Sequence, residues 1–557
     1  MDLSKAKPVI VIGGSLVGLS AAVCLRALGV PVTLIERHEA SSPHPRAVGF
    51  TTRSFEIFRI VGLEDKIPAS NAGGKGPPRR IAVESLSGKW HEEKAWTKPA
   101  ETTRGPSGGK GKPPQNPLFG HSQYSPSSGS AIAQDKLEPI LRARAEELGA
   151  VLRLGWTVTA WEQDTEGLQA SISDKQGNQE TVSGSYLVAC DGARSSVRQK
   201  LGIAMHGVGH MRKLSSILFR CPPIDKYLES GYSQFAINNE RMDAFLVTYR
   251  DGRWALMIWG SKSTVTEAPK DEVAQRTIIR EAIGDGVELT DEDISVISTG
   301  DWDLSAEVAE SFSQGRVFLA GDAAHTLPPT RGGYGANTGI ADVHNLAWKL
   351  AAVLSGKSKP GLLESYSAER QPTARLRHDQ VFVREDYKEH APPGSEWDNS
   401  NTPVYEDVAI ELGQLYKSSV ILPDETELDS TNSQVFARRP DEWCAKPGTR
   451  APHLWLTRRN AGERQSILDL FGRDFVLLSE RDLSKDAPAG CRFVRLGQEG
   501  DWTPEEGVDA FRKAFGVSSS GAVLVRPDGY VAWRSSSGDF SADQVAHAFS
   551  VAAQCAL

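Results

Sequence analysis

Cysteine is scarce in this chain, and basic residues do not outnumber acidic ones. The 557 residues include six Cys, and no two of them form a C-x-x-C pair. This pattern excludes a disulfide-framed secreted module and argues against a zinc ribbon or a dithiol redox site. The 63 Lys and Arg against 71 Asp and Glu give a net charge of −8, which argues against a nucleic-acid-binding protein.

One long uncharged run, residues 8–25, approaches the length of a membrane span. It contains Gly13, Gly14 and Gly18 and lacks the small-residue cleavage site of a signal peptide. We therefore predict a buried strand, a glycine turn and a helix in place of an anchor. The length of 557 residues predicts three or four domains, and 39% hydrophobic residues indicate a soluble globular chain. The expected location is the cytoplasm.

A nucleotide-binding βαβ unit is predicted at the start of the chain. Residues 9–12 (VIVI) and 32–36 (VTLIE) have the apolar pattern of buried strands, and residues 13–18 read GGSLVG. Such a turn lets the backbone approach a pyrophosphate at the start of a helix. Glu36, eighteen residues after Gly18, stands where a carboxylate can accept ribose hydroxyls. Ser15 replaces the second glycine of G-x-G-x-x-G. FAD, NAD and NADP all remain possible, and so does a plain glycine-rich turn.

Two further short apolar strands, at 186–190 and 317–320, each run into an aspartate. Asp191 opens the segment DGARSSVR, and Asp322 stands in GRVFLAGDAAH. The segment 328–337 (PPTRGGYGAN) then opens a helix that ends near Leu354. The N-terminal end of this helix is a second candidate anion-binding site. Either aspartate alone could be a helix cap, and we expect His325 to make a structural hydrogen bond.

Residues 216–220, 244–249 and 254–259 alternate like antiparallel strands, with Asp251-Gly252 as a hairpin turn. Aromatic residues on or near these strands are candidates for substrate contact: Phe235, Phe245, Trp254 and Trp259. Successive side chains of a strand point to opposite faces, so only one face can line a pocket. Core packing is the alternative for each of the four.

The remaining chain divides into a loop, helices and a separate end. Residues 104–117, with four Gly and four Pro, are predicted to be an exposed connector, with a lid over a pocket as the alternative. A helix is predicted over 135–148, with Asp135 and Glu138 at capping-box spacing. The last 110 residues, 448–557, have the pattern of a separate α/β unit.

The three strand-end motifs, in this order and at these distances, resemble the flavoprotein aromatic hydroxylases, the para-hydroxybenzoate hydroxylase-like FAD monooxygenases. The match covers residues 8–385. The segments GTRAPH at 448–453 and LDLFG at 468–472 resemble the tail of the phenol and aromatic polyketide hydroxylase branch. The resemblance implies an α/β Rossmann-type FAD domain (1–75, 130–204 and 301–390), an α+β antiparallel-sheet substrate domain (76–129 and 205–300), a connector (391–447) and a thioredoxin-like domain (448–557).

The resemblance also implies residue roles. The pyrophosphate of FAD would lie on Gly13, Gly14, Ser15, Leu16, Val17 and Gly18, and the adenosine ribose on Glu36. Along the FAD would lie Arg37, Gln134 and Arg46. Arg46 would reach the pyrophosphate and the pyridine nucleotide, and it is the one candidate catalytic residue. Asp191 and Arg194 would serve both FAD and NAD(P)H, and Asp322 the ribityl chain. Around the isoalloxazine would lie Pro329, Gly333, Gly335, Ala336 and Asn337. No metal site is expected.

One departure from the family concerns the loop from Asp322 to Gly335, which is one residue longer than usual. Arg331 is the extra residue, and it could reach the active site or point to solvent. This length leaves open where Pro329 stands against the flavin ring.

The implied activity is hydroxylation of a phenolic or polycyclic polyketide substrate through a flavin C4a-hydroperoxide, with FAD, NADPH or NADH, and O₂. The expected partner is a small aromatic molecule, with no nucleic acid and no membrane, and a homodimer is a candidate assembly. Three alternatives stay open. A flavin halogenase shares the fold but usually carries a W-x-W-x-I-P segment that is absent here. A Baeyer–Villiger oxygenase would look almost the same in sequence, and a non-catalytic nucleotide-binding scaffold is the third.

Overall fold

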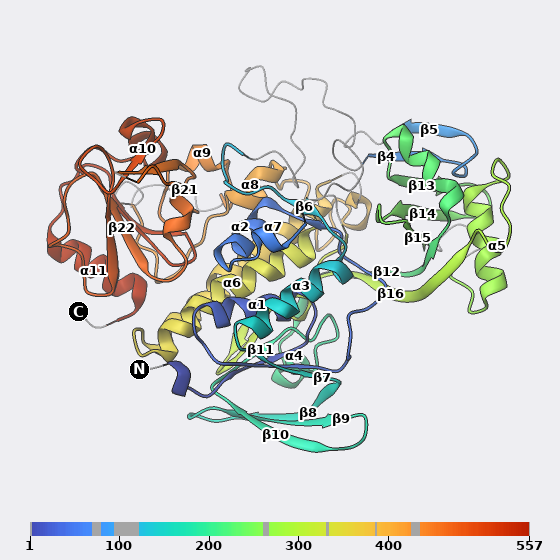
Figure 1. Cartoon of the computed structure of the whole chain (residues 1–557), viewed down its shortest axis with the longest axis horizontal. Coiled ribbons are helices and arrows are strands. Elements are labelled where there is room, and N and C mark those ends of the chain that lie inside the picture. Colours follow the sequence, from blue (N-terminus) through green and yellow to red (C-terminus); the bar gives the residue numbers. More distant parts are fainter. Residues whose placement is uncertain are drawn as a thin grey trace.

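The computed structural model describes residues 3–68, 79–93, 122–259, 267–329, 333–384, 387–424, 435–459 and 461–555. A central α/β part lies between an antiparallel sheet on one side and the C-terminal unit on the other (Figure 1). No helix within these residues is long and apolar enough to cross a membrane. The predicted loop at 104–117 and Arg331 lie outside the described residues.

The central part is a six-stranded sheet of order β17-β18-β11-β1-β2-β7, parallel except for β17. Its strands are β1 (Val9–Ile12), β2 (Val32–Glu36), β7 (Val151–Leu154), β11 (Tyr186–Ala189), β17 (Ser313–Gln314) and β18 (Val317–Leu319). Its helices are α1 (Leu16–Ala27), α2 (Thr52–Ile60), α3 (Gln134–Glu147), α4 (Ser196–Leu201), α6 (Tyr334–Leu354) and α7 (Glu364–Phe382). Two smaller pieces join it: β3 (Gly49–Phe50) with β6 (Ser130–Ala131), and the sheet of β8 (Trp156–Gln163), β9 (Leu168–Asp174) and β10 (Gln179–Gly184).

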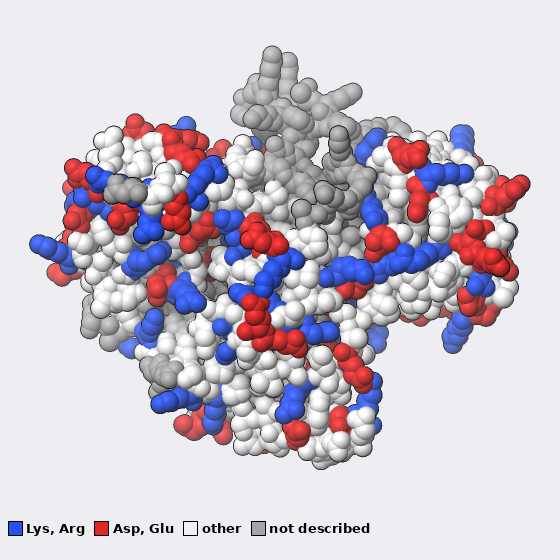
Figure 2. Space-filling model, viewed as in Figure 1, with Lys and Arg blue, Asp and Glu red and all other residues white. Residues whose placement is uncertain are grey.

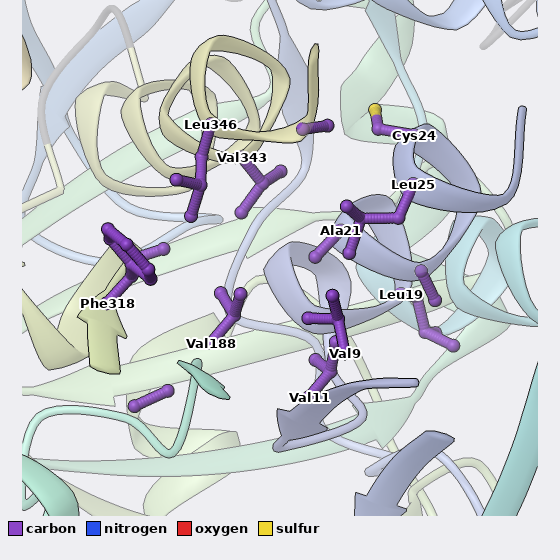
Figure 3. Packing of buried hydrophobic residues seen from close by; sticks show 14 of the residues in the cluster. Val9, Val11, Leu19, Ala21, Cys24, Leu25, Val188, Phe318, Val343 and Leu346 are labelled. Atoms are coloured by element: carbon purple, nitrogen blue, oxygen red, sulfur yellow. The ribbon is translucent and has the colours of Figure 1, made fainter. Parts of the chain in front are cut away.

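Burial of apolar side chains between this sheet and its helices forms the largest core. The four residues of β1 and of β11 are all buried, as expected for strands covered on both faces. In Figure 3, Ala21 of α1 and Val343 of α6 lie above Val188 of β11. The predicted βαβ unit is confirmed, and it fixes the start of α1 against the sheet.

A long antiparallel sheet forms the second part, in the order β19-β16-β12-β15-β14-β13-β4-β5. Its strands are β4 (Arg80–Val83), β5 (Trp90–Glu93), β12 (Met205–Arg220), β13 (Gln234–Asn238), β14 (Asp243–Thr248), β15 (Arg253–Ile258), β16 (Ser295–Ala309) and β19 (His325–Thr326). Only β4 and β13 run parallel. The helix α5 (Glu272–Ile283) packs on one face, which we call the outer face, and the other, inner face is turned toward the central part.

The C-terminal unit contains two small sheets, β21-β20-β24 and β23-β22-β25-β26. In the second sheet β22 and β23 are parallel, whereas β25 is antiparallel to both β22 and β26. The elements are β20 (Trp455–Arg458), β21 (Arg464–Ser466), β22 (Phe475–Ser479), β23 (Cys491–Arg495), β24 (Trp502–Pro504), α10 (Val508–Phe515), β25 (Ala522–Val525), β26 (Val531–Ser535) and α11 (Ala542–Ala553). Ahead of it come α8 (Asp407–Leu412) and α9 (Pro440–Trp443).

The predicted capping box of α3 is wrong. The N-cap is Ala133, and no side chain caps the helix. Asp135 instead pairs with Arg253 of β15 at 2.9 Å, and Glu138 turns into the interior. Tertiary partners therefore outcompete the local cap.

Candidate cofactor and substrate site

The three strand-end motifs meet at one edge of the central sheet. Gly13 follows β1, Asp191 is the second residue after β11, Asp322 lies in the turn after β18, and Glu36 ends β2. These four strands are neighbours and run parallel. Ligands of open α/β sheets bind at the carboxyl ends of the strands. The fold therefore brings three motifs that are more than a hundred residues apart in the sequence together in one candidate site.

The glycine turn at this edge leaves no room for a side chain at Gly13 or Gly18. Gly13 has φ of +100°, and a Cβ there would lie 2.3 Å from the carbonyl oxygen of Cys190. A Cβ on Gly18 would lie 1.8 Å from the carbonyl oxygen of Gly13. Because the turn needs glycine at both positions, it brings the start of α1 close to the sheet edge, where the first backbone N–H groups of a helix can bind an anion. Leu16 is buried beneath the turn, and Val17 packs against Gly321.

Glu36 shapes the turn that precedes α1. Its Oε2 accepts a hydrogen bond from the backbone N–H of Gly14 at 2.6 Å, and its Oε1 accepts one from His38 N–H at 2.8 Å. Arg37 is exposed beside it and donates from Nε to His38 at 3.1 Å. The carboxylate therefore stands at the end of β2 as predicted, held by two backbone groups.

Glu138 is a site residue that sequence reasoning missed. It is 3% exposed, and its Oε1 accepts hydrogen bonds from Ser15 Oγ at 2.6 Å and from Gln134 Nε2 at 2.8 Å. The Oε1 of Gln134 in turn accepts from the backbone N–H groups of Arg46 and Ala47, both at 3.3 Å. This chain of contacts connects the glycine turn to the loop that carries Arg46.

The second motif places one of its charged side chains at the surface and the others in the interior. Asp191 Oδ2 accepts from the backbone N–H of Val197 at 3.3 Å, as a helix-capping side chain would, while its buried Oδ1 has no hydrogen-bond partner among the described residues. The Arg194 side chain is 88% exposed and pairs with Asp303 at 2.6 Å. Arg198 is the buried arginine of this motif, and it donates to the carbonyl oxygen of Ala323 at 2.9 Å. Arg198, which was not predicted, connects the second motif to the third.

Asp322 has the environment of a carboxylate that lines an interior space. The residue is exposed, yet desolvation by the surrounding protein raises the pKa of its carboxyl, against the lowering effect of His325 and Arg46. Arg46 itself is exposed, and its charge also helps to lower the pKa of His44, after burial. The positive side chain of Arg46 and the carboxylate of Asp322 are therefore brought near each other.

His325 makes the structural hydrogen bond that was predicted. Its buried Nε2 lies 2.8 Å from Asp342 Oδ2 of α6, and Arg370 of α7 donates to the other oxygen of Asp342 at 2.8 Å. Gly321 N–H also reaches Asp342, at 3.2 Å. The arrangement attaches the turn that carries Asp322 to the middle of α6.

The opening of α6 is held by Asn337. Gly333 is the N-cap residue, with φ of +58°. The side chain of Asn337 donates to the carbonyl oxygens of Gly333 (2.8 Å) and Gly49 (3.2 Å) and accepts from Thr51 N–H (3.0 Å). Asn337 thus anchors the helix start, while Gly335 and Ala336 are half-buried at its first turn. Pro329 is exposed, and its carbonyl oxygen accepts from Tyr387 Oη at 2.9 Å.

The four candidate aromatic residues lie on opposite faces of the antiparallel sheet. Phe235 and Trp254 are 0% exposed in the outer-face core beside α5, with ring centroids 6.2 Å apart. Phe245 and Trp259 lie on the inner face, with centroids 6.1 Å apart. Because strand side chains alternate, we remove Phe235 and Trp254 from the candidate substrate surface and keep Phe245 and Trp259.

Comparisons with known proteins agree with this site. A family model described as FAD binding domain matches residues 6–381, and one described as aromatic-ring hydroxylase, C-terminal, matches residues 445–552. A 4-methyl-5-nitrocatechol 5-monooxygenase of Burkholderia sp is 37% identical over 95% of this chain and 94% of its own length. A putative polyketide hydroxylase of Streptomyces halstedii is 36% identical over 96% of this chain and 94% of its own. A solved structure of aklavinone-11 hydroxylase with FAD and aklavinone aligns with a TM-score of 0.81 at 29% identity, covering 98% of this chain and 99% of that one.

Proposed function

The chain belongs to the FAD-dependent aromatic-ring hydroxylases, and from this premise we propose a role in the reaction for each residue of the site. The chain is a monooxygenase that uses FAD, O₂ and a nicotinamide reductant to hydroxylate an aromatic compound. What remains to be assigned is which side chains hold the cofactor, which contact the substrate and what class of substrate they suit.

The residues at the sheet edge fit FAD. The tight turn from Gly13 to Gly18 supports a pyrophosphate site, because a Cβ at Gly13, Gly14 or Gly18 would clash with neighbouring protein atoms and the turn leads directly into the start of α1. The buried Asp191 Oδ1, without a protein partner among the described residues, and the desolvated carboxylate of Asp322 both suit the hydroxyl groups of the cofactor. Asp322 carries the proposal: its exposed carboxylate lies in the turn after β18 and beside Gly335 of the first turn of α6, where desolvation by the surrounding protein raises its pKa.

We assign the remaining cofactor contacts accordingly. Glu36 lies where the adenosine ribose would bind, with Arg37 beside it. Gln134 and Arg46 would follow the FAD, and Arg46 would also meet the anionic nicotinamide nucleotide. Around the flavin ring we place Pro329, Gly333, Gly335 and Ala336, with Asn337 fixing the helix opening. Arg194, on the surface, is left with a role toward NAD(P)H alone.

The chain positions the reactants and controls charge and water. Bound FAD supplies the oxygen-transfer chemistry, using O₂ after reduction by the nicotinamide. The N-terminal end of α6, at Gly333, would stabilise negative charge nearby, because the 21-residue helix directs its positive dipole end there. Apolar inner-face side chains such as Leu214 and Leu304 exclude water from the space between the two parts.

A phenolic ring is the substrate class that the inner face supports best. Phe245 and Trp259 offer flat apolar contact there. The relative named as a 4-methyl-5-nitrocatechol 5-monooxygenase has a phenolic ring in its named substrate, which supports this class. Figure 2 shows a row of Lys and Arg side chains over the region of β12, with Asp and Glu side chains beside it over α3; the basic row supports approach of the anionic nicotinamide nucleotide on this face.

We propose that the C-terminal unit is thioredoxin-like and structural. Its sheet β23-β22-β25-β26, with one parallel and two antiparallel pairs followed by a C-terminal helix, supports that comparison. Redox activity is not part of the proposal, because burial raises the pKa of Cys491 to about 12 and no C-x-x-C pair exists. All six cysteines are free, which supports a reducing, cytoplasmic location.

The proposal is tested by comparing Asp322→Ala with Asp322→Asn. Removing the acceptor leaves cofactor hydroxyls unpaired at a cost of about 1–3 kcal/mol, so the Ala variant should bind FAD about tenfold to a hundredfold more weakly, whereas Asn retains an acceptor. Flavin content is measured after purification, and NAD(P)H oxidation is measured with a panel of simple and polycyclic phenols. Glu310→Gln, an exposed carboxylate outside the site, is the control. Equal FAD occupancy in the Ala variant and the parent would reject the Asp322 assignment, and a parent enzyme that no phenol stimulates would reject the substrate class.

A further inference from the structure

Arg212 is a cation on the inner face of the antiparallel sheet. Along β12, Leu214 and Leu218 pack on this face, and Ser216 contacts His44 of the cofactor loop. The period of two places Arg212 in the same row. Its guanidinium lies 5.1 Å from the centre of the ring of Trp259, the residue that follows the neighbouring strand β15. The side chain is therefore directed into the apolar surface that we assign to the substrate.

Arg212 has no anionic partner within the part of the chain that the structure describes. Its Nε is buried and has no hydrogen-bond acceptor. The next residue, Lys213, shows the usual arrangement: it points outward and lies 3.1 Å from Asp301 and 3.6 Å from Glu267. A cation that is partly withdrawn from water without a counter-ion is costly, so an arginine kept in this state is prepared for an anion that the protein does not supply.

His390, in the segment that follows α7, lies beside the apolar cluster that contains Trp259: its ring centroid is 6.3 Å from that of Tyr387, a member of this cluster. Burial, and then the charge of Arg212, lower the pKa of the His390 imidazole, against an opposing effect of Glu389. Its Nε2 is buried without a hydrogen-bond partner among the described residues, and a carboxylate oxygen of Glu389 is 3.8 Å away. His390 therefore adds a second nitrogen with unmet hydrogen-bonding capacity to the surface that carries Arg212.

Aromatic and apolar groups surround this pair. One cluster combines Trp259 and Trp302 of the sheet with Tyr387 and Ala391 of the segment after α7. It also includes Leu327 of the loop before α6, and the hydroxyl of Tyr387 binds the carbonyl oxygen of Pro329 in that loop. The surface therefore suits a ring, and it adjoins the loop at which we place the flavin.

From this juxtaposition we propose that Arg212 and His390 form a recognition site for an anionic oxygen, a phenolate or a carboxylate, attached to the aromatic substrate. The guanidinium donates to the oxygen, the imidazole nitrogen makes the second contact, and Trp259 packs on the ring. The inference rests on the proposed function, because the ligand that the pair orients is the substrate of that reaction. It makes both residues specificity determinants, and it gives the segment after α7 a direct part in the site.

The test is equilibrium binding to the oxidised, FAD-loaded enzyme, followed by the flavin absorbance change. Three catechols of similar size serve as probes: 4-nitrocatechol as the phenolate, 3,4-dihydroxybenzoate as the carboxylate, and 4-methylcatechol as the neutral compound. The parent should bind at least one anionic probe tenfold or more tighter than 4-methylcatechol. Which anion is preferred distinguishes the two oxygen types.

The variants separate recognition from folding. Arg212→Gln should reduce the anion preference to below threefold while leaving 4-methylcatechol binding and FAD content unchanged. Arg212→Lys should retain part of the preference, and His390→Asn should lower it independently. The matched control is Lys213→Gln, which removes the same charge one residue away on the outward side and should behave as the parent.

Three results would overturn the inference: an unchanged preference in Arg212→Gln, an equal loss for all three probes, or a parent that favours the neutral catechol. In the last case, the proposed function would still stand if a neutral phenol stimulated NAD(P)H oxidation by the enzyme. Conversely, an Arg212-dependent anion preference in an enzyme that no phenol stimulates would support the site and reject the proposed function.

Discussion

Replacing Glu369 by Gln should loosen the attachment of the C-terminal unit to the helices that support the cofactor site. Glu369 of α7 accepts hydrogen bonds from Arg526 in the β25–β26 turn at 2.6 and 2.8 Å. It also accepts from Lys349 at 2.9 Å and from Asn345 at 2.7 Å, both on α6. The Glu369, Arg526 and Lys349 side chains are 0% exposed, so no water shares their charges.

The magnitude follows from what the substitution leaves behind. Gln keeps the shape but removes the charge, and Asp528 remains as the only carboxylate bonded to Arg526 among the described residues, at 2.5 Å. Breaking a buried ion pair by removing one partner costs about 3–5 kcal/mol. Burial already lowers the pKa of Lys349 to about 8, against the raising effect of Glu369. Loss of Glu369 therefore lets Lys349 shed its proton near neutral pH, which favours the lower end of that range.

Urea unfolding at pH 7, followed by tryptophan fluorescence, measures the effect. Trp348 is a local reporter, since the Arg526 guanidinium lies 5.2 Å from the centre of its ring. The control is Glu505→Gln, which breaks an exposed pair with Arg464 in the same unit and should cost less than about 1 kcal/mol. The double variant Glu369→Gln/Arg526→Gln should lose less than the two single losses added together, because both remove the same interaction. A loss below about 1 kcal/mol for Glu369→Gln would refute the reasoning, since that is the value of a surface pair.

Two further predictions concern the glycine turn and acid stability. Gly18→Ala should abolish FAD binding, because its Cβ would lie 1.8 Å from the carbonyl oxygen of Gly13. Flavin absorbance of the purified protein measures the loss. The control is Gly361→Ala, where the atom nearest to the new Cβ is 3.6 Å away. Burial lowers the pKa of His344 to about 3, so only the unfolded chain gains its proton as the pH falls below about 6.5. The free energy of unfolding should then fall by about 2 kcal/mol between pH 8 and pH 5 because of this residue. If the urea midpoint of His344→Gln fell as steeply with pH as that of the parent, the assignment would be contradicted.

The sequence predicted the parts of the site that local patterns determine. The VIVI strand, the turn around Gly13 and the aspartates that follow two further apolar strands are each contained in about ten residues, and parallel pairing alone brings their ends to one edge. The mixed α/β class was predicted for the same reason. His325 was rightly expected to make a structural hydrogen bond, and its partner, Asp342, lies 17 residues further along the chain.

What the sequence could not provide depends on tertiary contacts between distant segments. Glu138 has the spacing of a cap, and only the approach of Ser15 and Gln134 shows it to be a support of the glycine turn. Alternation predicted that one face of the antiparallel sheet carries the substrate, but not which face, since that depends on where α5 packs. Arg212 gave no signal, because an arginine on a strand reveals its lack of a partner only when its surroundings are known.

The length of α6 connects the cofactor edge with the C-terminal unit. Its first turn, at Gly333, is fixed by Asn337, and its middle by Asp342, which holds the turn that carries Asp322 through His325 and Gly321. One and two turns further on, Asn345 and Lys349 belong to the buried charge cluster with Arg526 of the C-terminal unit. These polar residues recur every three to five positions, so they share one side of the helix. A helix held by directional contacts at its start, middle and end cannot shift along its axis without breaking several at once. The C-terminal unit therefore contributes to the site without touching it, by holding in place the helix whose first turn we assign to the flavin.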